Sequence, residues 1–130
     1  MSSQSSETSS VAGHNLRLDR ENYAKTLWDY AFTNACFPRG IRPTDIDFMV
    51  EMNKHFLFGE FAQPNKELSK GQEYALNRLA RQPNTTVFRV VGFPPNSVGE
   101  WEVIGSGRSG TGTDSFLEFL REWVESVDGA

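Results

Sequence analysis

Residues 43–63 read PTDIDFMVEMNKHFLFGEFAQ, and this segment predicts more of the fold than any other part of the chain. Polar and apolar residues alternate over 45–51, which is typical of a strand with one buried face. Residues 55–61 are almost all apolar or aromatic, as expected of an inner strand covered on both faces, and only Glu60 interrupts them. A two-residue turn at Asn53-Lys54 would join the two strands into a hairpin.

Antiparallel counting across that turn brings two carboxylates together on one face of the hairpin. It places Asp47 opposite Glu60 and Asp45 opposite Ala62, whereas a longer turn would place Asp45 opposite Glu60. Like charges in this arrangement repel, and a divalent cation with oxygen ligands is the simplest way to offset the repulsion. The alternative is that Asp47 and Glu60 are independent, solvated edge residues. The pattern therefore predicts a metal site that contains Glu60.

The composition is typical of a small intracellular protein. The chain has 130 residues, 38% of them hydrophobic with ten Phe and three Trp, which is enough for one domain with one core. No apolar run approaches the ~18 residues of a membrane span, and the start lacks the pattern of a secretory signal. We therefore expect no membrane partner and a cytoplasmic location, in a bacterial or phage-encoded protein.

Charge and cysteine content limit the function further. The formal net charge of -4 argues against broad, non-specific attraction to nucleic acid, although a local basic strip remains compatible with it. The lone cysteine, Cys36, cannot form an internal disulfide, and its apolar helical context predicts a buried structural role.

The segments on either side of the hairpin predict two helices. The first is expected over 19–35, where Asp19 can cap the first turn and small and apolar residues form a stripe that can pack on a sheet. Ser69 and Gln72 have the S-x-x-Q spacing of a capping box, which predicts a second helix that ends near Arg81.

The remaining segments complete a mixed α/β fold. Residues 85–91 form a predicted strand, parallel to 55–61 because a helix connects the two. A short strand is expected over 101–104 and a last helix over 113–127. The predicted order is α-β-β-α-β-β-α, a mixed four-stranded sheet flanked by helices. The Ser-rich residues 1–15 are expected to be a disordered tail, and residues 16–130 a single domain.

A glycine-rich segment, GSGRSG at residues 105–110, fits the G-x-G-x-x-G pattern of dinucleotide-binding loops. No strand follows the last helix to complete the βαβ unit that such a loop requires. We interpret the segment as a flexible linker, with nucleotide binding as a weaker alternative.

The order of motifs after the hairpin resembles a known family. An aspartate is followed by Glu60-Phe61-Ala62, then by Leu68-Ser69-x-x-Gln72 and by leucines of the predicted helix. This order resembles the PD-(D/E)xK nuclease superfamily, in particular the VRR-Nuc and Holliday-junction-resolvase-like domains of phage and repair enzymes. The likeness covers about residues 40–91. Pro43-Thr44-Asp45 matches the family's Pro-Asp imperfectly, with one residue inserted.

The resemblance implies a restriction-endonuclease-like core and Mg²⁺- or Mn²⁺-dependent cleavage of DNA, branched or otherwise structured, by a protein that can act as a homodimer. The implied metal ligands are Asp47 or Asp45, Glu60 and the backbone carbonyl of Phe61. Gln72 would hold a metal-bound water or a phosphate oxygen, or would only cap its helix.

The chain departs from the family where E-x-K requires a lysine, because that position is Ala62. Alanine cannot position or activate a water, so we expect an inactive form. Engineered removal is the favoured interpretation and a naturally inactive relative the alternative. Rescue by Lys66 or Lys70 is less favoured, since both lie in the loop or at the helix start. The rival function is a non-catalytic module on a nuclease fold that binds nucleic acid or protein.

Several basic residues lie in the middle of the chain, and some could contact phosphates. Lys66, Lys70 and Arg42 are the predicted nucleic-acid contacts, and scattered surface charge is the alternative. The full set is Arg39, Arg42, Lys66, Lys70, Arg78, Arg81 and Arg89.

Overall fold

The computed structural model describes residues 28–129 of the chain, which divides into two units, Met1–Pro43 and Thr44–Ala130. The predicted tail, residues 1–15, lies outside the described residues, as do residues 19–27 of the predicted first helix. In the part of the chain that is described, no helix is long and apolar enough to cross a bilayer.

The described end of the predicted first helix is a 3₁₀-helix rather than an α-helix. This element, η1 (Tyr30–Cys36), begins after Asp29, whose carboxylate accepts the Ala31 N–H at 2.9 Å. Thr33 adds a side-chain hydrogen bond to the Tyr30 carbonyl at 2.7 Å, and such local bonds compete with a regular helix. The element has no buried residues, and Cys36 is exposed, so the prediction that Cys36 is buried is wrong.

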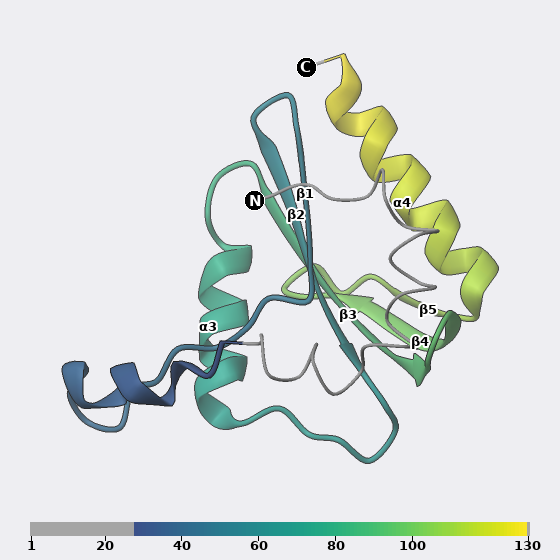
Figure 1. The fold of residues 1–130 in the computed structure, drawn as a ribbon. Coiled ribbons are helices and arrows are strands. Elements are labelled where there is room, and N and C mark those ends of the chain that lie inside the picture. Colours follow the sequence, from purple (N-terminus) through teal and green to yellow (C-terminus); the bar gives the residue numbers. More distant parts are fainter. Residues whose placement is uncertain (1–27, 130) are drawn as a thin grey trace, which may run out of the picture. The chain divides into compact units, whose positions relative to one another are not determined.

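The second unit is built on a mixed five-stranded sheet (Figure 1). The strands follow the order of the sequence across the sheet. β2 and β3 are parallel and are connected by α3, as predicted, and the other neighbours are antiparallel. The α/β class is confirmed, whereas the predicted number of four strands is wrong. The strands are β1 (Phe48–Met52), β2 (His55–Ala62), β3 (Thr85–Phe93), β4 (Ser97–Val103) and β5 (Ser109–Thr111), and α3 is Lys70–Ala80.

The predicted hairpin is confirmed in turn length and register. Asn53 and Lys54 have φ values of 55° and 70°, as the two-residue turns that match the twist of a hairpin require. Met52 pairs with His55, and the ladder ends one residue after Asp47, at the Phe48–Gly59 pair. Extending this register by one residue would place Asp47 opposite Glu60, as the two-residue turn predicts.

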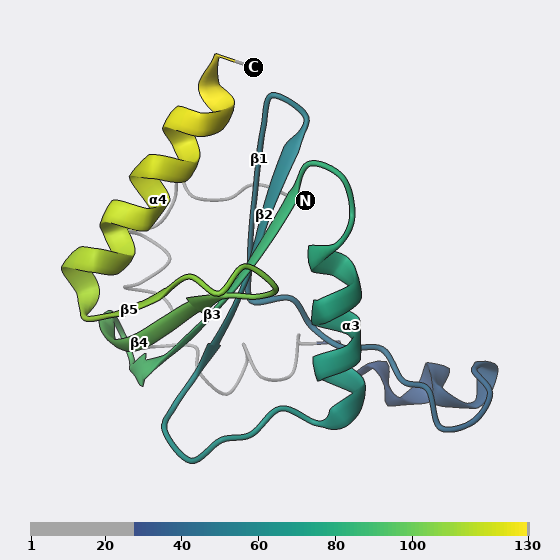
Figure 2. The ribbon, with the colours of Figure 1, turned by 180° about the vertical axis from the view of Figure 1, so that it is seen from behind.

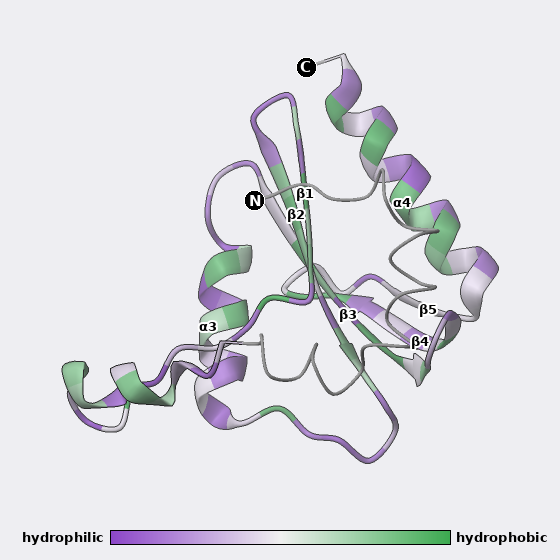
Figure 3. Ribbon diagram, in the orientation of Figure 1, coloured by the Kyte–Doolittle hydropathy of each residue, from purple (hydrophilic) through white to green (hydrophobic). Residues whose placement is uncertain are grey.

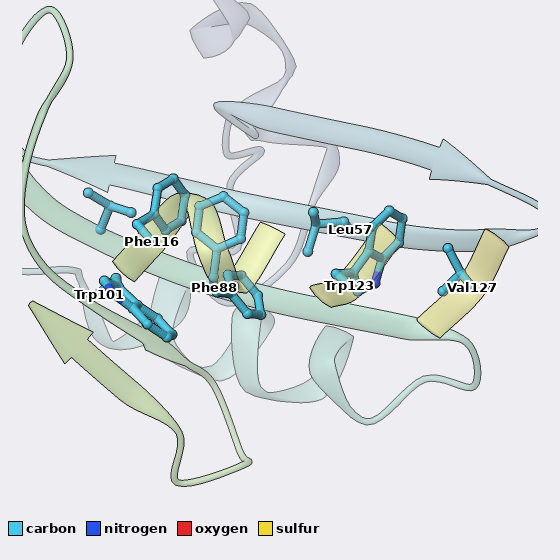
Figure 4. Packing of buried hydrophobic residues seen from close by; sticks show 8 residues of the cluster. Leu57, Phe88, Trp101, Phe116, Trp123 and Val127 are labelled. Carbon is cyan, nitrogen blue, oxygen red and sulfur yellow. The ribbon is translucent and has the colours of Figure 1, made fainter. Parts of the chain in front are cut away.

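The two α-helices of this unit lie on opposite sides of the sheet (Figures 1 and 2). α4 (Thr113–Asp128) carries an apolar stripe, visible along its length in Figure 3. The stripe packs on side chains from β2, β3 and β4 to form the core (Figure 4). Gly59 lets the strands approach, because a Cβ at that position would meet the ring of Phe88, which is fully buried. The core residues are Leu57, Phe88, Val90, Trp101, Phe116, Phe119, Trp123 and Val127.

Residues 109–110 of the glycine-rich segment belong to a strand, so the interpretation as a flexible linker is wrong for these two residues. β5 pairs with β4, with Gly110 opposite Trp101. A side chain at Gly110 would meet the Trp101 indole, whose Nε1 donates to Ser115 Oγ at 2.8 Å. Glycine thus allows the strand to pass closely over a core tryptophan.

Candidate functional site

The face of the sheet that carries α3 contains most of the predicted site residues. Side chains alternate along a strand, and Leu57 of β2 points into the core under α4. Glu60 and Ala62 therefore point to the opposite face. A pocket of about 550 Å³ opens there. Its walls include Asp47, Glu60, Phe61, Ala62, Lys66, Glu67, Gln72, Arg89 and the segment 92–98.

Asp47 is held at the start of the hairpin by a backbone hydrogen bond. The Phe61 N–H donates to Asp47 Oδ2 at 2.9 Å, which fixes the carboxylate beside the strand that carries Glu60. Asp47 lines the pocket, whereas Asp45 does not. Between the two aspartates considered from the sequence, the geometry thus favours Asp47 as the partner of Glu60.

The environment of Glu60 disfavours its negative charge. Burial raises the pKa of Glu60 above its ordinary value, and the negative charge of Asp47 raises it further. Arg89 acts in the opposite direction, and Asp45 adds a smaller upward contribution to the pKa. The charge of Asp47 therefore acts on Glu60 across the hairpin.

This raised pKa predicts that Glu60→Gln stabilises the protein without divalent cations. The fold binds a proton on Glu60 more tightly than the unfolded chain does. The resulting stability is fully present below the unfolded pKa and is lost as pH rises through the folded pKa. At pH 7 we expect Glu60→Gln to raise the free energy of unfolding in urea, with the gain disappearing below pH ~4. Glu73→Gln, on the exposed side of α3, is the control, and an equal gain there would contradict the coupling.

Gln72 has the structural role that the sequence predicted. Its backbone N–H donates to Ser69 Oγ at 3.1 Å, and the Ser69 N–H donates to Gln72 Oε1 at 3.1 Å, which completes the capping box. Its Nε2 donates to Thr44 Oγ1 at 3.3 Å. The side chain lines the pocket while both ends of its amide have partners, so a contact to water or phosphate stays a prediction.

The predicted basic contacts are distributed unevenly. Lys66 lines the pocket, whereas Lys70 begins α3 and is not among the lining residues. Arg42 belongs to the unit Met1–Pro43, so the structure gives it no place relative to the pocket. Arg89 is one of the basic residues that could contact phosphates, but the sequence did not single it out for the site. The signal that could have found it is the parallel pairing of two predicted strands, which sets Arg89 beside Glu60.

Ala62 lies in the pocket wall, on the same face as Glu60. It occupies the position where the resemblance requires a lysine. A longer side chain at this position would extend into the cavity rather than into the core under α4.

The donor set of the pocket fits a hard divalent cation. Asp47 and Glu60 could each supply a carboxylate oxygen and Phe61 its backbone carbonyl. Within residues 28–129, no group of three or more His, Cys, Asp or Glu side chains gathers as a metal site would. Mg²⁺ in enzymes that act on phosphates is often bound by only one or two carboxylates, with water and substrate oxygens completing its shell. Two carboxylates are therefore sufficient for this type of site.

No protein-family model, curated protein or solved structure matches the chain. The class that the structure defines is an α/β fold with an open, mixed five-stranded sheet in which β2 and β3 are parallel.

Proposed function

We propose that the pocket binds Mg²⁺ or Mn²⁺ together with a DNA phosphodiester. In this proposal the chain is a PD-(D/E)xK-type endonuclease domain that is inactive because position 62 is alanine. The observation that carries the proposal is that Asp47, Glu60 and Ala62 line one pocket. Branched DNA as substrate and a homodimeric form belong to the same proposal and rest on the sequence resemblance alone.

The residues of the pocket have distinct roles in this proposal. A bound divalent cation would supply a Lewis acid and lower the pKa of a water bound to it. Asp47 and Glu60 provide oxygen ligands, and the Phe61 N–H keeps the Asp47 carboxylate oriented. Lys66 adds positive charge at the pocket wall. The methyl group of Ala62 can neither hold the attacking water nor transfer a proton, which accounts for the expected lack of turnover.

A second candidate is a non-catalytic module that binds nucleic acid. It is favoured by the combination of Ala62 with the cationic residues Lys66 and Arg89 in one pocket. Binding of this kind would weaken with salt and would require no metal. The two candidates differ in whether DNA binding depends on a divalent cation.

A Mn²⁺ titration by calorimetry tests the proposal. We expect wild-type protein to bind Mn²⁺ at neutral pH. Asp47→Asn and Glu60→Gln should each weaken binding more than the roughly 10- to 100-fold that loss of an outer-shell partner costs. Asp128→Asn, at the exposed end of α4, is the control and should bind Mn²⁺ as the wild type does. Absence of Mn²⁺ binding, or equal binding by all four proteins, would exclude the proposed metal site.

A further inference from the structure

Arg89 lies next to Glu60 in the centre of the sheet. The two residues are partners in the parallel pairing of β2 and β3, and both line the pocket. On its other side, Arg89 is the partner of Glu102 in β4. A cation is thus placed between two carboxylate-bearing strands, on the face that carries the pocket.

The guanidinium of Arg89 has few partners for a group with five donors. Among residues 28–129 it makes one hydrogen bond, from Nη2 to the Lys66 carbonyl at 3.1 Å. Its Nε is buried and has no acceptor within the described part of the chain. The described ion pairs are Arg108–Glu122 and Arg121–Glu118, so Arg89 approaches neither Glu60 nor Glu102 closely enough to form one. A buried donor without an acceptor, such as this Nε, costs free energy that a ligand on the guanidinium could offset.

The charge of the pocket indicates what kind of ligand this is. Without a cation, the carboxylates of Asp47, Glu60 and Glu67 outnumber Lys66 and Arg89. A divalent cation on Asp47 and Glu60 would offset two negative charges and leave the wall positive overall. A phosphate oxygen then becomes the favoured acceptor for a guanidinium, whose planar fork matches phosphate geometry.

We propose that Arg89 is a phosphate-binding residue that holds a non-bridging oxygen of a DNA phosphodiester beside the Asp47–Glu60 pair. This inference rests on the proposed function, since it assumes that DNA enters the same pocket. Arg89 supplies a positive charge in the pocket, where Ala62 stands in place of a lysine. It acts as a binding and positioning group rather than as a proton donor or acceptor. The purely structural alternative is that Arg89 only offsets the charges of Glu60 and Glu102 within the sheet.

Fluorescence anisotropy of a labelled DNA duplex with Mn²⁺ present tests the inference. Arg89→Met should weaken DNA binding roughly 10-fold, because it removes a hydrogen bond to a charged group. It should also lower the slope of log affinity against log salt by about one, the change expected for one lost phosphate contact. Arg89→Lys should keep the slope and lose part of the affinity, because it retains the charge but not the fork. Arg121→Met, an exposed arginine of α4, makes the same charge change and should alter neither quantity.

Mn²⁺ affinity of the same variants separates this inference from the proposed function. Arg89→Met should bind Mn²⁺ at least as tightly as wild type, since it removes a positive charge near the ligands. If Arg89→Met binds Mn²⁺ normally and loses no more DNA affinity than Arg121→Met, the inference is wrong and the proposed function stands. Joint loss of Mn²⁺ and DNA binding would show the purely structural role. A wild type that binds no Mn²⁺, or no DNA, would overturn both the proposed function and the inference.

The stability of the variants is checked by thermal unfolding. If Arg89→Met does not fold, Arg89→Lys decides the question. Reduced DNA affinity with an unchanged salt slope would then support the inference, and wild-type affinity would overturn it.

Discussion

Ala62→Lys is expected to give this chain Mn²⁺-dependent DNA cleavage. The substituted side chain would extend into the pocket that already contains Asp47 and Glu60. There its amine could orient the attacking water or transfer a proton, a contribution typically worth about 10²- to 10⁴-fold in rate. We therefore expect cleavage of labelled DNA by Ala62→Lys in Mn²⁺ at least about 10²-fold faster than by wild type.

Two control variants make this prediction specific. Ala62→Met has a long side chain without the charge and should remain inactive. Adding Glu60→Ala to Ala62→Lys should abolish the cleavage, because the metal would lose a ligand. Failure of Ala62→Lys to cut linear, single-stranded or four-way-junction DNA, while it folds and binds Mn²⁺, would favour the non-catalytic binding module.

Phe88→Ala is expected to have the largest effect on stability. Phe88 is fully buried in β3, and its ring contacts four other phenylalanines, Phe48, Phe61, Phe116 and Phe119. Removing the ring would leave a cavity between the sheet and α4. Substitutions of this type cost about 3–5 kcal/mol, a large share of the stability of a small domain. Urea unfolding measures the loss.

Phe56→Ala is the matched control for that experiment. Phe56 is 38% exposed, and its ring stacks on that of Phe58. Because its ring is already partly in water, its removal should cost less than half as much free energy as Phe88→Ala. Equal losses from the two substitutions would mean that the core is not where the structure places it.

The central hairpin could be predicted from the sequence because local rules determine it. Asn53 suits a turn that needs positive φ, and the alternation before it fixes which side chains share a face. The capping box at Ser69 and Gln72 is equally local. The parallel pairing of β2 and β3 followed from the helix between them.

The errors arose where a tertiary contact or a local side-chain hydrogen bond overrides the sequence pattern. β5 has glycines that are typical of loops, yet it forms a strand because Gly110 fits against Trp101. The segment Tyr30–Cys36 has apolar residues at helical spacing, but the Asp29 cap and the Thr33 side-chain bond accompany a 3₁₀-helix. The spacing of residues in the sequence alone could not distinguish a loop from the strand β5, or an α-helix from a 3₁₀-helix.

The candidate site was predictable in part. The two-residue turn predicts Asp47 near Glu60, and the pocket includes both, as it includes Lys66 and Gln72. The placement of Arg89 beside Glu60 depends on the register between β2 and β3, which no local motif specifies. Lys70, the first residue of α3, is not among the residues that line the pocket, and its contact with nucleic acid stays a prediction.

The most direct test of metal binding by Asp47 and Glu60 is to locate bound Mn²⁺ by anomalous scattering in a crystal of the wild-type protein. The proposed metal site requires a peak in contact with carboxylate oxygens of both Asp47 and Glu60 and near the Phe61 carbonyl, and no such peak for Asp47→Asn. A Mn²⁺-saturated crystal in which the pocket has no peak, or in which the ion contacts neither carboxylate, would contradict it.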